Sequence, residues 1–372
     1  MVSETFGKYL TGTVKPHIDE ILHQKAKEYY EQRDGLKDKY LKIFKQVFAD
    51  TQKFTEQTGN ETSMVSFTLL RSNFLYGKKA YAVHVYDKEW CFNDYMKTGE
   101  IDVTDFFEGL DKAKEFLKRD AKRYVGKLNA SDVDNAISWY LEAFGQFLIK
   151  VFRYTLIEAT ESEEFTGIVK NANFRIYTGE LYGKPHVIYN ETKNRTSYKQ
   201  LADLIASEED CHCLDLRNSN FSDSSLVNAD LSFADFRSSR LENTDFDNTL
   251  LIGCIFANCE LSGANFYGTQ LSEANFSNAN LKGANLSAIA AAEGVFEMDD
   301  GQQRFHFPLN LHGANMSGAI IRGATLHGVD FTQANVEEID FEYTSLSQCK
   351  FKRAQLSQLK LTEGQRSQIT LI

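Results

Sequence analysis

The chain has 372 residues, enough for two domains, and a net charge of −11. Residues 211–372 carry 19 acidic and 11 basic side chains, a net charge of −8, and the other 210 residues carry the remaining −3. This balance argues against direct nucleic-acid binding, which needs a basic stripe. It permits a protein partner with a basic surface, and it is equally typical of a surface charged for solubility.

The cysteines and the N-terminus indicate where the protein works. Six cysteines show no disulfide spacing, which favours a reducing compartment. The first residues lack the apolar core of a signal peptide, and no stretch reaches the roughly 18 apolar residues that span a bilayer. We therefore expect a soluble, cytoplasmic protein without membrane contact.

The first elements expected along the chain are helical and then extended. Residues 1–16 read as a lead-in, followed by a long amphipathic helix that Gly35 bends or breaks and that Gly59-Asn60 ends. Residues 64–70 and 79–86, rich in β-branched and aromatic side chains, predict a β-hairpin.

Two more helices and a second hairpin follow. Thr104 or Asp105 can cap a helix to about residue 127, and Ser131 or Asp132 can cap a longer, more apolar one to about residue 158. Residues 172–177 and 181–189 predict the second hairpin. Both hairpins contain Leu-Tyr-Gly-Lys followed by His-Val, so they are related by duplication and pair into one sheet, or the short match is chance.

Residues 1–208 are therefore expected to form an α+β domain with long helices and two hairpins. Its last element is a short helix over residues 197–207, placed where the next domain needs a lid. No family is identified for this half of the chain.

The C-terminal half repeats every five residues. Every centre of the repeat is apolar, and the residue two before it is usually small, with Asn or Asp between, as in Ala264-Asn265-Phe266. The centres are Leu216, Phe221, Leu226, Leu231, Phe236, Leu241, Phe246, Leu251, Phe256, Leu261, Phe266, Leu271, Phe276, Leu281 and Leu286, then Leu311, Met316, Ile321, Leu326, Phe331, Val336, Phe341, Leu346, Phe351, Leu356 and Leu361.

A period of five fits neither a helix nor a single strand, but it fits a solenoid. In extended backbone, residues i−2 and i point the same way, so the small residue and the Leu or Phe face one interior and the Asn or Asp faces water. Three residues then turn a corner, and each turn of the coil pairs with the one below it.

This pattern resembles the pentapeptide-repeat family over about the last 160 residues. The resemblance implies a right-handed quadrilateral β-helix with four repeats per coil, over residues 209–372. From Phe236 to Leu281 the centres alternate Phe and Leu, so a four-sided coil would stack Phe on two opposite faces. Residues 362–372 are expected to cap the C-terminal end, because an open end exposes unpaired backbone.

Residues 287–310 interrupt the repeat. There are 24 residues between Leu286 and Leu311, where an unbroken repeat needs four. A degenerate coil would bury Asp299 and Arg304, which costs several kcal/mol, so we expect an inserted loop with a hairpin around Asp-Gly. Long loops in compact folds often bind partners, although a neutral insertion is also tolerated. The predicted partner-binding residues are Glu293, Phe296, Glu297, Asp299, Asp300, Arg304, Phe305 and His306.

No sequence motif for catalysis, a cofactor or a metal is present. There is no phosphate loop, nucleophile elbow or His-Glu-x-x-His motif, so no catalytic, cofactor-binding or metal-ligating residues are predicted. Cys211-His212-Cys213 lacks an evident fourth ligand and reads as part of the domain junction. His84 and His186 lie in predicted strands and read as structural.

Two classes of function remain. The first is a non-enzymatic scaffold that binds a protein through its flat faces and its loop. The family resemblance suggests one such partner, a type II topoisomerase bound by mimicry of duplex DNA, but the large N-terminal domain and modest acidity depart from that type. The second is a ligand-binding or catalytic N-terminal domain positioned by the repeat. A deep pocket lined by convergent polar groups within residues 17–190 would favour it, and a filled core would count against it.

Overall fold

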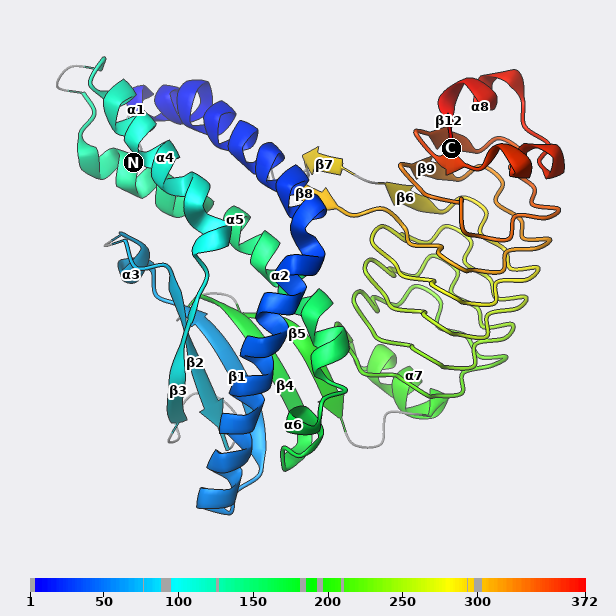
Figure 1. The fold of residues 1–372 in the computed structure, drawn as a ribbon, viewed down its shortest axis with the longest axis horizontal. Helices are drawn as coiled ribbons and strands as arrows, with labels where there is room; N and C mark the ends of the chain where they lie inside the picture. The colour runs from blue at the N-terminus through cyan, green and yellow to red at the C-terminus, as the bar shows by residue number, and fades with distance from the viewer. Residues whose placement is uncertain are drawn as a thin grey trace. The chain divides into compact units, whose positions relative to one another are not determined.

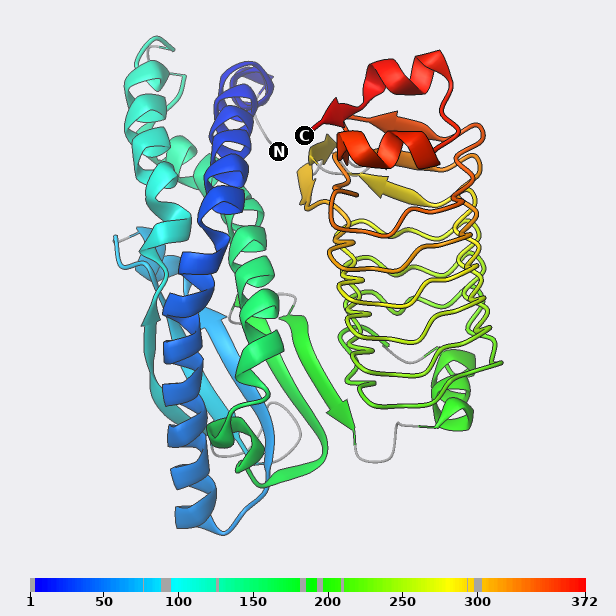
Figure 2. The same cartoon turned by 45° about the vertical axis from the view of Figure 1, so that its right-hand side comes forward.

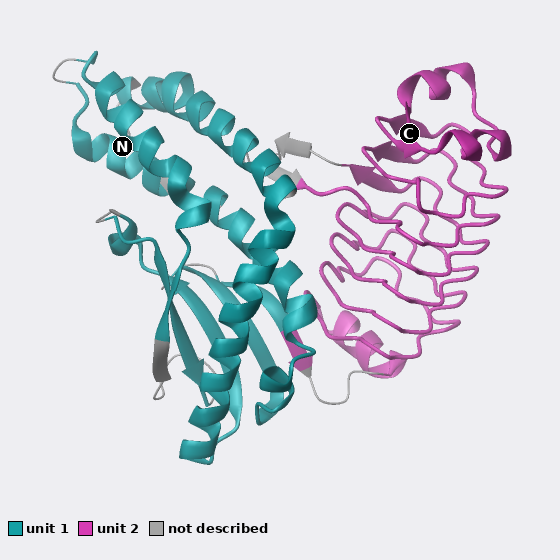
Figure 3. Cartoon of the chain, viewed as in Figure 1, with its two compact units in different colours: residues 1–189, 297–304 teal, residues 190–296, 305–372 magenta. Residues whose placement is uncertain are grey.

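The chain divides into two compact units. The computed structural model describes residues 4–75, 77–87, 95–124, 127–180, 185–192, 197–208, 211–292, 294–297 and 303–372. Unit 1 comprises residues 1–189 with 297–304, and unit 2 comprises residues 190–296 with 305–372 (Figure 3). The sequence suggested a boundary between residues 208 and 209, whereas residues 190–208 group with the repeats.

Unit 1 begins with helix rather than a lead-in. Helix α1 (Glu4–Tyr9) and a π-helical turn, η1 (Leu10–Val14), run directly into α2 (Lys15–Thr58). The expectation for residues 1–16 was therefore wrong, because Tyr9 is fully buried and its hydroxyl donates to the Leu117 carbonyl at 2.9 Å. Helix α2 continues unbroken through Gly35 and ends, as predicted, at Gly59, which has a φ of +69°.

One mixed sheet carries both predicted hairpins. Its strand order is β3-β2-β1-β4-β5, with β1 (Thr62–Leu69) antiparallel to β2 (Ala80–Tyr86) and parallel to β4 (Lys170–Glu180) (Figure 1). The edge strands are β3 (Tyr95–Asp102) and β5 (Pro185–Thr192). The pairing of the hairpins into one sheet is confirmed. Strand β3 and the one-turn helix α3 (Arg71–Leu75) were not predicted.

Three helices cover one face of this sheet. The rings of Phe44 on α2, Phe67 on β1 and Phe152 on α5 (Ala130–Ala159) lie 5.1–5.2 Å apart pairwise, and α4 (Thr104–Ala121) adds Phe107. Asn129 caps α5 in a capping box with Asp132. A short helix, α6 (Glu163–Thr166), precedes β4. The core of unit 1 is thus an aromatic layer between helices and sheet.

Unit 2 is a coil with four repeats per turn (Figure 2). Residues that bridge neighbouring turns are 20 apart, from Asp215–Asp235 to Gln270–Ala290. Its first end is covered by α7 (Tyr198–Ala206), whose Leu201 is fully buried in the repeat core, so the predicted lid is confirmed.

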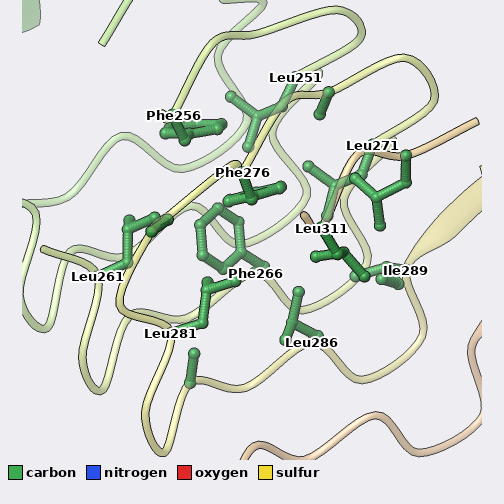
Figure 4. Packing of buried hydrophobic residues seen from close by; sticks show 14 of the residues in the cluster. Leu251, Phe256, Leu261, Phe266, Leu271, Phe276, Leu281, Leu286, Ile289 and Leu311 are labelled. Atoms are coloured by element: carbon green, nitrogen blue, oxygen red, sulfur yellow. The ribbon is translucent and has the colours of Figure 1, made fainter. Parts of the chain in front are cut away.

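The interior of unit 2 is a dry stack. Every repeat centre from Leu216 to Phe351 has at most 2% of its surface exposed. The rings of Phe236, Phe256 and Phe276 stack on one side at 4.8–5.0 Å, and Phe246 stacks on Phe266 at 5.0 Å on the opposite side. Figure 4 shows Phe256, Phe276 and Phe266 within this core. The predicted stacking of Phe on two opposite faces is confirmed.

Two structural features outside the centres stabilise the coil. The residue two after most centres turns the corner in the left-handed region, with φ of +54 to +72°, and Gly or Asn occupies most of these positions. The Asn before the centre forms ladders, with Asn285 donating to Asn265 and Asn265 to Asp245 at 2.8–2.9 Å. These side chains were expected simply to face water, but they bond along the coil axis.

The interruption is shorter than the sequence suggested. Strand β6 (Ala290–Ala292) still pairs with β9 (Thr325–His327), and Ala291, fully buried, occupies a centre. Asn275 then bridges Asn310, 35 residues on rather than 20, so the excess is 15 residues instead of 20. No coil intervenes between these bridged residues, which confirms the rejection of a degenerate coil. Strands β7 (Gly294–Glu297) and β8 (Gln303–His306) pair, as expected of a hairpin.

The C-terminal cap begins earlier than residue 362. After β10 (Ser345–Ser347) and β11 (Lys350–Phe351), residues Arg353–Gln358 form a 3₁₀ helix, so Leu356 and Leu361 are not centres and are only partly buried. The Gln355 amide donates to the carbonyls of Phe331 and Ala334 at 2.9–3.0 Å, satisfying the last coil.

The cap then closes with one more helix and a strand. Helix α8 (Glu363–Gln368) follows Thr362 as predicted, and its Gln365 amide donates to the carbonyls of Phe341 and Thr344. Strand β12 (Thr370–Leu371) pairs in parallel with β11. The final turn therefore has both its carbonyls and its open edge covered.

Three helical glycines of unit 1 give a matched prediction. A Cβ at Gly109 on α4 would lie 2.8 Å from Ile21 Cγ2 of α2, whereas one at Gly35 would meet nothing within 4 Å. One at Gly145 on α5 would meet only the Tyr81 hydroxyl, at 3.7 Å. We expect Gly35→Ala and Gly145→Ala to raise the free energy of unfolding by about 0.5–1 kcal/mol, and Gly109→Ala to lower it by about 1 kcal/mol through overpacking.

Urea unfolding followed by tryptophan fluorescence measures this, because Trp90 and Trp139 both belong to unit 1. A Gly109→Ala variant as stable as Gly35→Ala would show that α2 and α4 do not approach as closely as described.

Candidate functional site

The predicted partner-binding residues lie on the inserted hairpin. Phe296 and Glu297 are in β7, and Arg304, Phe305 and His306 are in β8. Glu293, Asp299 and Asp300 lie outside the described residues, as do the side chains of the four strand residues other than His306. Strand pairing brings the two arms together.

The base of the hairpin is held by the coil. His306 Nδ1 lies 2.9 Å from Glu273 Oε1, and the two side chains are only 16% and 8% exposed. The Glu273 N–H donates to the Phe307 carbonyl at 3.1 Å. Glu273 has a φ of +66°, a left-handed position where most repeats have Gly or Asn. A carboxylate at this corner thus anchors the returning arm of the hairpin.

One wall of the coil exposes large apolar side chains. This wall, called here the Phe266 wall, is built by the residues flanking the stacked centres Phe246, Phe266, Leu286, Ile321 and Phe341. Tyr267, Ile320 and Tyr343 on it are 48%, 42% and 84% exposed. Tyr343 has a φ of +61°. Sequence reasoning missed this residue, although a tyrosine in a column of left-handed corners otherwise occupied by Asn, Gly and Ala was a readable signal.

Charged side chains surround Tyr343. Arg322, one coil away, donates to Asp340 at 2.6 Å and lies 3.2 Å from Glu342. The Glu342 N–H and the Arg322 guanidinium both bond Asp340 and hold the pKa of its carboxyl below the usual range. The wall therefore presents an exposed aromatic ring beside two carboxylates and one guanidinium.

Unit 1 contains a pocket of about 180 Å³ at the end of its sheet. The polar side chains that line it are Arg71, Tyr81, Thr178, Glu180 and His186. The pocket is open to solvent on one side rather than deep, so it matches only part of what a ligand-binding N-terminal domain was expected to show. Sequence reasoning missed it, because its residues come from five separate segments and match no motif.

The polar groups of the pocket are partly paired. Arg71 Nε donates to Glu180 Oε2 at 2.7 Å, with 53% of the Arg71 and 21% of the Glu180 side chain exposed. Glu180 Oε1 and the hydroxyl of Thr178 are buried and bond to no described residue. Burial and the nearby Glu180 raise the pKa of Tyr81 far above its usual value, so its hydroxyl stays a neutral donor.

The Cys-His-Cys segment does not gather metal ligands. His212 Nε2 pairs with Asp230 Oδ2 at 3.1 Å, while Cys211 and Cys213 are buried and are not in a disulfide. Burial would raise the pKa of Asp230, but hydrogen bonds from His212 and Ser232 outweigh it and hold that pKa to about 2. Within the described residues, no group of His, Cys, Asp and Glu is placed to hold a metal ion.

The two predicted strand histidines differ in setting. His84 is buried, with Nδ1 2.8 Å from the Thr68 hydroxyl on the face of the sheet opposite the helices, consistent with a structural residue. His186 instead lines the pocket. Among the described helices, none is both long and apolar enough to cross a bilayer.

Comparison with known proteins identifies the repeat. Residues 215–253, 249–287, 309–337 and 330–363 match the family of pentapeptide repeats, in eight copies. Unit 2 is thus a pentapeptide-repeat solenoid interrupted by one hairpin, and the residues before 215 lie outside the match. No curated protein sequence matches the chain.

Part of the chain is also similar to solved structures of other proteins. QnrB1, a plasmid-mediated fluoroquinolone resistance protein, is 16% identical over 43% of this chain and 83% of its own, with a TM-score of 0.25. HetL, a pentapeptide repeat protein involved in heterocyst differentiation regulation in the cyanobacterium Nostoc, is 19% identical over 42% of this chain and 84% of its own, with a TM-score of 0.19. Scores this low support no statement about the partner of this chain.

The buried thiols of the coil generate a prediction. Cys254 and Cys259 donate to carbonyls 23 residues earlier, and burial raises the pKa of Cys259 and Cys349 to about 12. Because the thiolate is the reactive form, we expect these thiols to react more than 100-fold slower with Ellman's reagent in the folded protein than in urea. A Cys91→Ser variant removes the one cysteine outside the described residues. Rapid native reaction of that variant would contradict the closed core.

Proposed function

We propose that unit 2 is a non-enzymatic scaffold that binds a partner protein through the Phe266 wall and the inserted hairpin. Its interior is filled along the whole described coil, so only its outer surface is left for recognition. The observation that carries the proposal is Tyr343, a large side chain placed where it gains nothing for folding.

Tyr343 costs stability where it stands. A non-glycine residue in the left-handed region is destabilised by about 1 kcal/mol relative to Gly, and Asn tolerates that region better than an aromatic residue. A side chain that is 84% exposed recovers almost nothing by burial. Strained residues of this kind cluster at binding sites, and tyrosine is prominent among the residues that dominate binding energy.

The surroundings of Tyr343 indicate the chemistry of the partner. Asp340 and Glu342 outnumber Arg322 around the ring, and Ile320 and Tyr267 extend the apolar surface along the same wall. We infer a partner with an apolar pocket for the ring and basic residues at its rim.

The hairpin supplies the second contact in this proposal. Its residues are the ones proposed from the sequence, namely Glu293, Phe296, Glu297, Asp299, Asp300, Arg304, Phe305 and His306. The support is its fixed base: the His306–Glu273 contact holds one arm against the coil, which limits the conformational entropy that this arm loses on binding. We expect the coil to be right-handed, as in the family.

The topoisomerase alternative has a direct test but no support from the described geometry. A mimic of duplex DNA needs a continuous acidic surface, and Arg217, Arg237, Arg240 and Arg322 interrupt the acids of the coil. A gyrase supercoiling assay without inhibition or drug protection removes this alternative.

We also propose that unit 1 binds a small ligand without catalysis. The pocket lined by Arg71, Tyr81, Thr178, Glu180 and His186 supports this. Gly145→Leu would fill the pocket from α5. Mass spectrometry of metabolites retained by the wild-type protein and lost from Gly145→Leu tests the proposal, and an identical retained set would oppose it.

The Tyr343→Asn variant separates stability from binding. We expect it to stabilise the last coils by about 0.5–1 kcal/mol, because Asn tolerates the left-handed conformation, and to reduce partner retention at least tenfold. Hydrogen–deuterium exchange over residues 330–351 measures the stability, and a quantitative pull-down measures retention.

Glu338→Asn is the matched control, since Glu338 is an exposed left-handed corner (φ +56°) on another wall. It should give a similar slowing of exchange with unchanged retention. Loss of the same partners from Tyr343→Asn and Glu338→Asn would count against the wall as the binding surface.

Removal of the hairpin is predicted to leave the coil intact. A variant lacking residues 294–308 and carrying Glu293→Gly restores the 20-residue spacing between turns and places glycine at the left-handed corner. We expect unchanged exchange protection in the neighbouring coils and loss of the partner. The deletion must remove 15 residues, because only this number restores the 20-residue spacing.

The control deletes 14 residues, 295–308, with the same substitution. The extra residue shifts the register and turns inward side chains outward, so protection should fall by at least tenfold in that coil. Equal protection in the two variants would show that the insertion is not a whole number of repeats.

A further inference from the structure

The pocket of unit 1 lies where two parallel strands end and their connections diverge. β1 and β4 are parallel neighbours in register at Leu69 and Glu180, their last residues. After β1 the chain turns through α3 to β2 on one side, and after β4 it turns to β5 on the other. Leu69, Arg71 and Glu180, which line the pocket, all lie at this end of the two strands.

The lining of the pocket combines apolar and polar side chains. Leu69, Leu141 and Ile149 contribute apolar surface from β1 and α5. The Arg71–Glu180 ion pair and the hydroxyl of Thr178, a side chain 2% exposed, contribute polar groups, and Glu180 lies beside Leu69, its register partner on the neighbouring strand. Glu180 Oε1 and Thr178 Oγ1 can each accept a hydrogen bond, and the half-exposed Arg71 guanidinium retains donors beyond its Nε.

Gly145 is a second, independent indication. It stands in the interior of α5, where glycine destabilises a helix relative to alanine. Packing does not require it, because a Cβ would make only an ordinary contact with the Tyr81 hydroxyl at 3.7 Å. A glycine that weakens its helix without relieving a clash, in the wall of a pocket, keeps that volume open for a ligand.

We propose that this pocket binds a small zwitterion, an aliphatic α-amino acid, as the ligand of unit 1. The ammonium group bonds Glu180 and Thr178, the carboxylate bonds Arg71, and the side chain packs on Leu69, Leu141 and Ile149. This inference rests on the ligand-binding function proposed for unit 1.

The charges that line the pocket and the size of the pocket favour an aliphatic α-amino acid. Arg71 and Glu180 already neutralise each other, so a lone cation meets the repulsion of Arg71 and a lone anion that of Glu180, whereas a zwitterion pairs with both. The volume of about 180 Å³ is below the roughly 300–1,000 Å³ of pockets for drug-sized ligands, and it suits a molecule of amino-acid size.

Isothermal titration calorimetry of the full chain with L-leucine tests the inference. 3-Methylbutylamine and 4-methylpentanoate, which each keep one charged group, are the matched probes. We expect leucine to bind with a Kd on the order of 1 mM, as is ordinary for so small a ligand. Each probe should bind at least tenfold more weakly. Glu180→Gln and Arg71→Gln should each weaken leucine binding at least tenfold, and Gly145→Leu should abolish it.

Gly35→Ala serves as the control with a helical substitution outside the pocket and should bind leucine like the wild type. Tryptophan fluorescence and far-UV circular dichroism establish that each variant is folded. Leucine binding that Glu180→Gln and Arg71→Gln leave unchanged overturns the inference, as does equal binding of the amine or the acid alone.

The failure of this inference is distinguishable from the failure of the ligand-binding function. No leucine binding, with another metabolite retained by the wild type and lost from Gly145→Leu, overturns the amino-acid class alone. No leucine binding and no such metabolite overturn both.

Discussion

The parallel pairing of each residue with the one 20 positions further along is the constraint on which unit 2 depends. It requires every turn to contain four repeats and every centre to stack on another centre, and most of the corners adopt the left-handed conformation. A change in length that is not a multiple of five would flip side chains between interior and surface. The inserted hairpin obeys this rule with 15 extra residues, which is why the coil resumes above it without distortion.

Much of the repeat unit could be predicted because its constraint is periodic. The Leu, Phe, Met and Val centres predicted which side chains face the interior, and the alternation of Phe with Leu predicted the Phe stacks. The prediction failed in two opposite ways. Ala291 occupies a centre, but its side chain is too small to stand out in the sequence. Leu356 fits the five-residue period, but it follows Gln355, the residue that ends the coil. A periodic pattern in the sequence reports only the spacing of residues. It does not show that the Gln355 amide bonds to the carbonyls of the preceding coil, because that contact depends on the folded structure.

Unit 1 shows the opposite case. Its three long helices and four of its five strands follow from local patterns, and capping residues placed the end of α2 and the start of α5 within a few positions. Its pocket does not follow, because Arg71, Tyr81, Thr178 and Glu180 come together only through the parallel pairing of β1 with β4. That pairing joins segments more than 100 residues apart, and no short-range signal specifies it.

Tyr343 and Gly145 belong to one argument although they lie in different units. Each is a poor choice for its backbone, an aromatic residue at a left-handed corner and a glycine inside a helix, and better folding residues fit both positions without a clash. Stability alone would replace them. One adds surface that nothing within the described chain covers, and the other removes a side chain from a wall that has room for it. Tyr343 adds contact area on the outside of unit 2, and Gly145 leaves space inside unit 1. Both lower stability, and both are what a protein with two binding functions requires.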